Sequence, residues 1–377
     1  ERAARRMTAL WCDATHTVSH GRWVPFNASE PDTCAQLHCT LSGRHGGRDM
    51  RMEWAPAQCR LPPLPLRGPA AAAARAHAIR FIGDSHTRQH FSALVRCYAP
   101  WCAIGDAAEM VLEQAALPSP RWVAMLRAAG FAEKVADGAV KYLMHTADEW
   151  RAGCERDGAA RIDFRQLFRL PPAGTGEVAA IMHALLYLGG APMRPSDTVV
   201  INFGVHYGVW DDGSELLPSV REMLHWWAAE HSAGRAPKLL WRETGPQHFN
   251  TSNGFYPRSK ADREGPPGHC VAMNARKRAA FFKFHEEIST GAVREVAERS
   301  GGWARVLPIM HPSAIRNDEH KLVHLPSSFV SRSPVDCTHY CDPSSVLRLW
   351  VQLLASYLLT ANDGALLELD MRQKRGR

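Results

Sequence analysis

The sequence predicts an α/β fold, a three-layer α/β/α sandwich in which a parallel sheet lies between two layers of helices. Short apolar runs, typical of buried strands, alternate along the chain with longer segments of helical character. The expected strands are residues 79–82, 197–204, 238–243 and 303–310, and the expected helices are residues 87–97, 177–189, 215–233 and 273–299. Strands separated by helices are joined by crossovers, which make the strands parallel and bury both faces of the sheet.

The rest of the chain is arranged around this main domain, which we expect over residues 79–365. Residues 1–60 are rich in Cys, Trp and turn residues, and they predict a small disulfide-tied lobe. The Pro- and Ala-rich segment 61–78 has the composition of a linker, and residues 366–377 that of a basic tail.

A membrane span is not expected within the sequence. Its most apolar segment, 346–359, contains Arg348 and Gln352 and so predicts an amphipathic core helix. Because the chain begins at Glu1 without an initiator Met or an apolar leader, we expect any membrane anchor to lie upstream of it.

The charge of the chain argues against one class of partner. Its formal net charge is +7, and much of the excess lies at the two ends. Nucleic-acid binding requires a basic stripe with interleaved aromatic residues inside the domain, and the sequence shows no such stripe. We therefore expect no nucleic-acid partner, whereas a mildly basic surface is compatible with acidic glycans.

The ten cysteines indicate the compartment. Their number is even and none forms a Cys-x-x-Cys pair, which favours disulfides in an oxidising compartment over a zinc site. Asn-x-Ser glycosylation motifs at Asn27 and Asn250 agree with a secretory route. The histidines lack metal-ligand spacing, so no metal is expected.

The first candidate for chemistry is the stretch Gly83-Asp84-Ser85, directly after an expected strand. A tight turn there places Ser85 at the amino terminus of the following helix, whose N–H groups favour negative charge on the serine oxygen. Ser85 is therefore a candidate nucleophile. The alternative is an ordinary surface turn, because Gly-Asp-Ser is a common turn tripeptide.

The second candidate is the pair Asp336 and His339. With this spacing the carboxylate can reach one imidazole nitrogen and leave the other free to take a proton from Ser85. The alternative is a helix-capping Asp beside a surface His. A third candidate, Asn202, ends an expected strand, where its amide could donate to an oxyanion together with the Ser85 N–H. An Asn that simply ends a strand is the alternative for this residue.

Together these blocks resemble the SGNH/GDSL hydrolase superfamily. More narrowly, they resemble its PC-esterase branch, the trichome birefringence-like polysaccharide O-acetyltransferases of plants and algae. The narrower resemblance rests on Cys12-Asp13 with Gly21-Arg22-Trp23-Val24, Glu53-Trp54-Ala55-Pro56 with Cys59-Arg60-Leu61-Pro62, Arg88-Gln89 after the Gly-Asp-Ser block, Arg242-Glu243-Thr244-Gly245-Pro246-Gln247-His248-Phe249, and Asp336-Cys337-Thr338-His339-Tyr340-Cys341. The chain departs from the family at Tyr340, where the family has Trp, and residues 98–195 show no landmark.

The resemblance implies O-acetyl transfer to a polysaccharide or oligosaccharide acceptor, through an acyl-serine and in the Golgi lumen. No bound cofactor is implied, only an acetyl donor as co-substrate, for which acetyl-CoA is a candidate. The implied catalytic residues are Ser85, His339 and Asp336. The implied oxyanion hole is formed by Ser85 and Asn202, with Gly105 as a guess for a third donor, and Arg88, Arg242 and His248 are implied to bind substrate. The implied disulfides are Cys12–Cys59, Cys34–Cys97, Cys39–Cys341 and Cys270–Cys337, with Cys102 and Cys154 as a further possible pair.

Two other functions are compatible with the same residues. A carbohydrate esterase would use the identical Ser-His-Asp set and differ only in admitting water to the acyl-enzyme. A non-catalytic carbohydrate-binding protein could keep the fold and use some of the 12 Trp residues to stack on sugars. The sequence predicts neither the acceptor glycan nor the oligomeric state.

Overall fold

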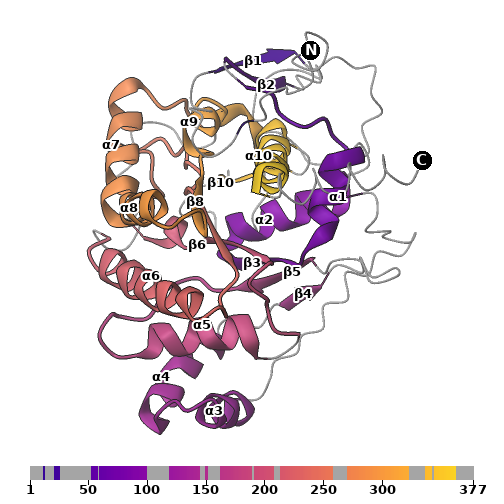
Figure 1. Ribbon diagram of the computed structural model, residues 1–377. Coiled ribbons are helices and arrows are strands. Elements are labelled where there is room, and N and C mark those ends of the chain that lie inside the picture. Colours follow the sequence, from indigo (N-terminus) through magenta and orange to yellow (C-terminus); the bar gives the residue numbers. More distant parts are fainter. Residues whose placement is uncertain are drawn as a thin grey trace, which may run out of the picture.

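The computed structural model describes residues 12, 21–25, 52–57, 59–99, 119–144, 149–151, 162–188, 191–207, 213–257, 270–321, 336–341 and 344–361. In this part of the chain a six-stranded sheet with the order β4-β5-β3-β6-β7-β8 forms the centre of the molecule (Figure 1). Its strands are β3 (Ile79–Gly83), β4 (Glu149–Arg151), β5 (Ile162–Gln166), β6 (Thr198–Asn202), β7 (Lys238–Arg242) and β8 (Ala304–Leu307). All are parallel except β4, which pairs antiparallel with β5 at one edge.

Helices cover both faces of the sheet, as the sequence predicts (Figure 1). Side chains of a strand alternate between the faces, so Val200 of β6 packs in one apolar cluster while Val199 and Ile201 pack in the other. The first cluster includes α1 (Gly68–Ala76), α2 (Ser85–Ala93) and α10 (Ser345–Ala361). The second includes α3 (Ser119–Ala128), α4 (Glu133–Met144), α5 (Glu177–Tyr187), α6 (Leu216–Ser232) and α8 (Gly291–Arg299). The α/β sandwich prediction is confirmed.

Two predicted helices are interrupted in the structure. The helix expected over 87–97 is α2 followed by the π-helical turn η2 (Leu94–Tyr98). The one expected over 273–299 consists of α7 (Ala275–His285), the π-helical turn η5 (Glu286–Thr290) and α8. Shorter elements complete the description: α9 (Met310–Ser313), η3 (Gly204–His206), η6 (Asn317–Glu319), and the pairs β1 (Gly21–Pro25) with β2 (Met52–Pro56) and β9 (His320–Lys321) with β10 (Asp336–Tyr340).

The segment expected to be a linker is part of the core. Helix α1 lies within residues 61–78 and packs against α10, and it buries Ala70, Ala73 and Ala74. Alanine has the highest intrinsic helix propensity, so the alanine run favours a helix. That helix then packs against the apolar helix α10. The linker prediction is therefore wrong for residues 68–76. Ahead of this helix, a disulfide between Cys12 and Cys59 ties the amino-terminal region, as expected.

The order of the strands determines where a ligand can bind. Strand β3 lies between β5 and β6, and the chain passes from β3 to β5 on one side and then to β6 on the other. Such a reversal opens a crevice at the carboxyl ends of the strands, where ligands of open α/β sheets bind. Ser85 follows the carboxyl end of β3 and so lies at this point. Within the described ranges, no helix combines the length and apolarity needed to cross a membrane.

Candidate active site

The turn between β3 and α2 requires glycine at its first position. Gly83 has a φ of 151°, a value that residues other than glycine rarely adopt. A Cβ at this position would also overlap the carbonyl oxygen of Asn202 on the neighbouring strand. The close approach of β3 and β6 and the sharp exit of the chain toward Ser85 therefore depend on the same residue.

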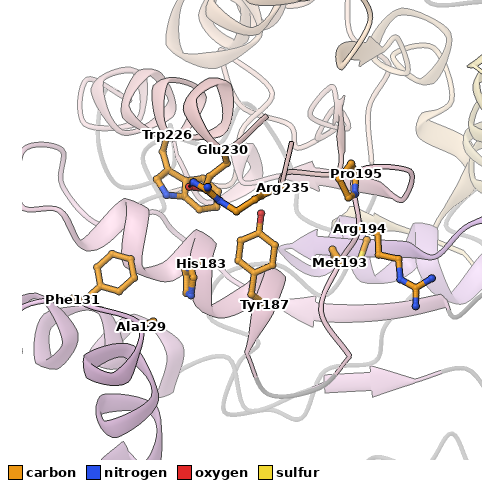
Figure 2. Close-up of a pocket in the computed structure, with 10 residues that line it drawn as sticks. All are labelled: Ala129, Phe131, His183, Tyr187, Met193, Arg194, Pro195, Trp226, Glu230 and Arg235. Atoms are coloured by element: carbon orange, nitrogen blue, oxygen red, sulfur yellow. The ribbon is translucent and has the colours of Figure 1, made fainter. Parts of the chain in front are cut away.

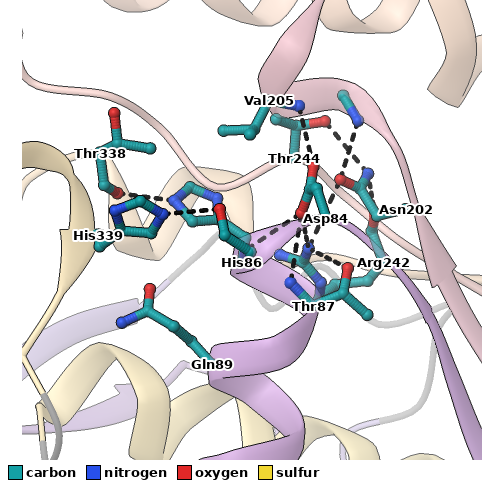
Figure 3. Close-up of polar contacts among 12 residues, drawn as sticks. Asp84, His86, Thr87, Gln89, Asn202, Val205, Arg242, Thr244, Thr338 and His339 are labelled. Atoms are coloured by element: carbon teal, nitrogen blue, oxygen red, sulfur yellow. Dashed lines mark hydrogen bonds and ion pairs between the residues drawn. The ribbon is translucent and has the colours of Figure 1, made fainter. Parts of the chain in front are cut away.

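Asp84 fixes the start of α2 and links it to the next strand (Figure 3). Its Oδ1 accepts hydrogen bonds from the N–H groups of His86, at 3.1 Å, and Thr87, at 3.3 Å, as a helix N-cap does. Its Oδ2 accepts a hydrogen bond from the N–H of Val205, in the loop after β6, at 3.2 Å. Ser85 is thus the first residue of a capped helix whose amino terminus is held against β6.

Ser85, His339 and Asp336 lie in hydrogen-bond contact, in the order that the sequence predicts. The Ser85 Oγ and the His339 Nε2 are 2.6 Å apart, and so are the His339 Nδ1 and the Asp336 Oδ2. Both His339 and Asp336 are partly exposed, at 29% and 22% of their side chains, so the group opens to solvent. This is the geometry of a Ser-His-Asp triad.

The carboxylate of Asp336 is held in its ionised form. Burial raises its pKa, but the hydrogen bond to the His339 ring and those from the N–H groups of Thr338 and His339 together lower the pKa well below its ordinary value. An ionised Asp336 accepts the hydrogen on the Nδ1 of His339, which leaves a lone pair on Nε2. That lone pair faces the Ser85 hydroxyl and can act as a general base.

Helix α2 also holds the backbone on both sides of His339. The Nε2 of His86 donates to the carbonyl oxygen of Thr338 at 2.6 Å (Figure 3). Gln89 binds Tyr340 twice: its Nε2 donates to the Tyr340 carbonyl at 2.5 Å, and its Oε1 accepts from the Tyr340 N–H at 3.2 Å. Sequence reasoning missed both roles, because polar residues near the start of a helix usually indicate an exposed face.

Arg242 does not lie where a substrate could reach it. Its side chain is fully buried beneath the turn, where the Nη2 donates to the Thr87 Oγ1 at 3.0 Å and lies 3.8 Å from the Asp84 Oδ1. The guanidinium also stacks over the ring of Trp350, and burial lowers its pKa to about 10. The expectation that Arg242 binds substrate is corrected: its charge compensates Asp84 inside the protein.

Asn202 likewise uses its side chain within the protein. Its Nδ2 donates to the carbonyl oxygen of Arg242 at 2.7 Å and to the Thr244 Oγ1 at 3.2 Å, and its Oδ1 accepts from the Gly204 N–H at 3.1 Å. Since both amide hydrogens are engaged, Asn202 can donate to an oxyanion only if one of these bonds breaks. In this conformation it positions the loop after β6 instead.

His248, expected to bind substrate, is fully buried behind the site. Its Nε2 lies 3.0 Å from the carbonyl oxygen of Ala314, and its Nδ1 lies 2.6 Å from the Nε2 of His320. The Nδ1 of His320 in turn lies 3.1 Å from the carbonyl oxygen of His339. Burial lowers the pKa of His248 to about 4. The His248–His320 pair therefore supports the strand that carries His339 and does not face the crevice.

The loop after β5 forms a second wall beside the nucleophile. The Leu167 N–H donates to the Gly83 carbonyl at 2.8 Å, which places the following residues next to the turn. The rings of Phe168 and His206 are 5.1 Å apart, and Arg169 donates from its Nη2 to the His206 carbonyl at 2.9 Å. Phe168 and Arg169 were not predicted, because residues 98–195 show no sequence landmark, whereas His206 follows the Asn202 block. The bond to Gly83 makes this loop a place to seek a second oxyanion donor.

Arg88 lies on α2, three residues beyond Ser85, and it is half-buried, whereas the other two predicted substrate-binding residues, Arg242 and His248, are fully buried. Gly105, the guess for a third oxyanion donor, lies outside the described residues.

Disulfides support β10, the strand that carries Asp336 and His339. Cys270 and Cys337 are bonded, as predicted, and the second of them follows Asp336 directly. Cys97 and Cys341 each form a disulfide as well. The partner expected for Cys97 is Cys34 and the partner expected for Cys341 is Cys39. These two cysteines, and the further candidates Cys102 and Cys154, lie outside the described residues.

The described residues contain no group of three or more His, Cys, Asp or Glu side chains that could hold a metal ion. The sequence matches no protein-family model, and a search of curated proteins finds no match to it. Fold and site together define the chain as an α/β protein with a Ser-His-Asp arrangement at the carboxyl edge of its parallel sheet.

Proposed function

We propose that this protein is an acyltransferase that moves an acetyl group, through an acyl-Ser85 intermediate, onto a hydroxyl of a polysaccharide. The observation that carries the proposal is the continuous contact from the Ser85 Oγ through the His339 ring to the Asp336 carboxylate, with 2.6 Å at each step. A purely structural histidine does not require both a serine hydroxyl at one ring nitrogen and an ionised carboxylate at the other. The choice of acetyl group and polysaccharide rests on the resemblance to the trichome birefringence-like family.

The first half of the reaction forms the acyl-enzyme. The Ser85 oxygen attacks the carbonyl carbon of the acetyl donor while the His339 Nε2 takes the hydroxyl proton. Asp336 stabilises the imidazolium that results. Negative charge on the donor oxygen develops at the amino terminus of α2, where the Ser85 N–H and the helix dipole favour it. His339 then returns the proton to the leaving group as the carbon–leaving-group bond breaks.

In the second half a sugar hydroxyl attacks the acyl-serine. His339 again acts as base, removes the proton of that hydroxyl and delivers it to the Ser85 oxygen when the ester bond breaks. Arg88 is the candidate for positioning the donor or the acceptor. The disulfides support a secretory-pathway location such as the Golgi lumen, because disulfides persist in oxidising compartments.

The experiment that tests the proposal compares donor consumption with and without an acceptor. The purified protein is incubated with an acetyl donor and with xylan, mannan or pectin oligosaccharides, and acetylated oligosaccharide is measured by mass spectrometry. Acetylated product that disappears in Ser85→Ala supports transfer. Donor loss that does not depend on the acceptor would instead indicate the carbohydrate esterase, and no donor loss in any mixture would reject both.

A further inference from the structure

A pocket lies near the amino ends of the parallel strands, at the end of the sheet opposite to Ser85. Its volume is about 590 Å³, within the range of about 300–1,000 Å³ that is typical of small-ligand sites. It is formed by the ends of α5 and α6, the loops that follow them, and the turn between α3 and α4 (Figure 2). Its lining includes Phe131, His183, Tyr187, Trp226, Glu230 and Arg235.

The connectivity of the sheet separates this pocket from the triad. The loops after α5 and α6 lead into the amino ends of β6 and β7, whereas Ser85 follows the carboxyl end of β3. The two places are therefore at least one strand apart, or about 16 Å for a five-residue strand. A ligand in the pocket does not touch the reacting atoms.

One wall of the pocket is a continuous series of aromatic rings. Ring centroids are 5.4 Å apart for Phe131 and His183, 5.1 Å for His183 and Tyr187, and 6.4 Å for Tyr187 and Trp226. His183 and Tyr187 are one turn apart on α5, so that both side chains lie on the same face of the helix. Trp226 is half-buried and leaves part of its indole accessible.

The polar groups of the pocket are grouped beside these rings. Glu230 and Arg235 form a bidentate ion pair, with contacts of 2.8 and 2.7 Å. The Tyr187 hydroxyl points toward this pair in Figure 2, is buried, and makes no hydrogen bond to any described residue. Burial raises the pKa of Tyr187 to about 12, so its hydroxyl keeps its hydrogen. A buried hydroxyl without a partner costs free energy that a ligand hydroxyl would recover.

These groups together define the chemistry of a ligand. Glu230 and Arg235 neutralise each other, and the guanidinium of Arg194, the other charged lining residue, is exposed and points away from that pair in Figure 2. The pair instead presents adjacent donors and acceptors, and the Tyr187 hydroxyl adds another, while the rings offer flat apolar faces. A pyranose ring has both complements, an apolar C–H face and hydroxyls on adjacent carbons.

We propose that this pocket binds sugar residues of a glycan chain. In the intact enzyme it holds the polysaccharide at a distance from Ser85 and raises the local concentration of acceptor without taking part in the chemistry. The identity of that chain with the acceptor rests on the proposed function, whereas the binding of sugar does not.

Fluorine NMR of the 5-fluorotryptophan-labelled protein tests binding directly. The Trp226 resonance is assigned from its loss in Trp226→Phe, and xylohexaose, mannohexaose and a homogalacturonan hexamer are titrated separately. We expect the Trp226 resonance to shift in a saturable manner with at least one of them, in Ser85→Ala as well as in the wild type. The matched control is Trp303, also half-buried but stacked on His231 outside the pocket, whose resonance should not move.

Tyr187→Phe keeps the ring and removes only the hydroxyl. It should weaken the binding seen at Trp226 by about threefold to tenfold, as expected for one lost hydrogen bond. An unmoved Trp226 resonance at about 10 mM oligosaccharide, well above a weak Kd of about 1 mM, would overturn the proposal. So would an unchanged affinity in Tyr187→Phe.

The same samples separate this proposal from the proposed function. Acetylation of Ser85 with no shift at Trp226 rejects the pocket and keeps the enzyme, and a shift at Trp226 without acetylation of Ser85 does the reverse. In an active enzyme, Trp226→Ala should raise KM for polymeric acceptor several-fold and leave kcat unchanged. An unchanged KM would contradict the link to the acceptor.

Discussion

Gln89 and Tyr340 are joined by a hydrogen bond in each direction, so that helix α2 holds the strand that carries His339. The Gln89 amide donates to the Tyr340 carbonyl at 2.5 Å and accepts from the Tyr340 N–H at 3.2 Å. Because Ser85 begins the same helix, this link sets the position of the nucleophile relative to its base. The distance between Ser85 and His339 thus depends on a side chain whose hydrogen bonds go to Tyr340 and not to either of these two residues.

Gln89→Met tests that link, since it keeps the length of the side chain and removes both hydrogen bonds. Two buried backbone groups are left unpaired, each of which should cost about 1–3 kcal/mol in the free energy of unfolding. The misplacement of His339 should lower kcat at least about tenfold, with little change in KM. Urea unfolding and steady-state kinetics measure the two effects.

The control for Gln89 is Gln352→Met. Gln352 is also buried and donates to the carbonyl oxygen of Pro62 at 3.0 Å, near β2 and away from the triad. It should lose stability and keep kcat. A Gln89 variant that behaves in the same way would show that Gln89 is only structural.

Asp84 should contribute more to stability than an ordinary helix cap. Asp84→Ala removes the cap of α2, removes the bond from the Val205 N–H and leaves Arg242 buried without its counter-charge. We expect the free energy of unfolding to fall by about 2–4 kcal/mol, against about 1 kcal/mol for Asn274→Ala, which removes only the cap of α7. Equal losses in the two variants, measured by urea unfolding, would argue against the wider role.

Arg242 and Arg88 should respond differently to substitution. Arg242→Met leaves Asp84 uncompensated and should lower stability and kcat, while KM for donor and acceptor stays within about twofold, because the guanidinium has no access to solvent. Arg88→Met should instead raise the KM of one substrate. The account of Arg242 fails if its substitution raises KM and leaves kcat and the unfolding midpoint unchanged.

Five buried histidines should make the fold sensitive to acid. Burial lowers the pKa of each, to about 4 for His248 and to about 3 for His285; the others are His86, His90 and His320. When the pH falls below the unfolded pKa of about 6.5, the unfolded chain binds protons that the folded protein does not. Stability is therefore complete above about pH 6.5 and decreases below it.

The expected loss is at most about 1.4 kcal/mol per pH unit for each histidine. Unfolding free energies measured between about pH 8 and pH 4.5 give the slope. The slope gives the number of protons taken up on unfolding, and His285→Phe should lower that number by up to one, because a phenyl ring does not titrate. The His285 ring is buried among Phe255, Phe281 and Phe284, so a phenyl ring suits its surroundings. An unchanged slope in this variant would contradict the assignment.

Much of the sheet could be predicted from sequence because β3, β6, β7 and β8 are apolar runs. Of the two neighbours of β3, only β6 was predicted, and β5 was not. β5 has the sequence Ile-Asp-Phe-Arg-Gln, whose charged residues are typical of a surface. In the structure the Asp163 carboxylate binds Arg80 on β3 at 2.6 and 2.9 Å, and both are buried. A partner far along the chain compensates the charge, and no local pattern reveals it.

The site was predicted in the same partial way. Ser85, Asp336 and His339 follow from residue type and spacing, because their chemistry requires those groups. For Arg242 and Asn202 the sequence indicates a strand end but not the side to which the side chain turns. Both turn inward, to groups on adjacent elements. Only the packing of β6, β7 and α2 decides that direction.

A mass spectrum of the protein after exposure to an acetyl donor shows directly whether Ser85 is the nucleophile. If it is, we expect one added acetyl group on the peptide that contains Ser85. This label should be absent in Ser85→Ala and slow to form in Asp336→Asn, which loses the ionised partner of His339. Equal labelling of the wild type and Ser85→Ala, or acetyl found only on other residues, would contradict this role of Ser85.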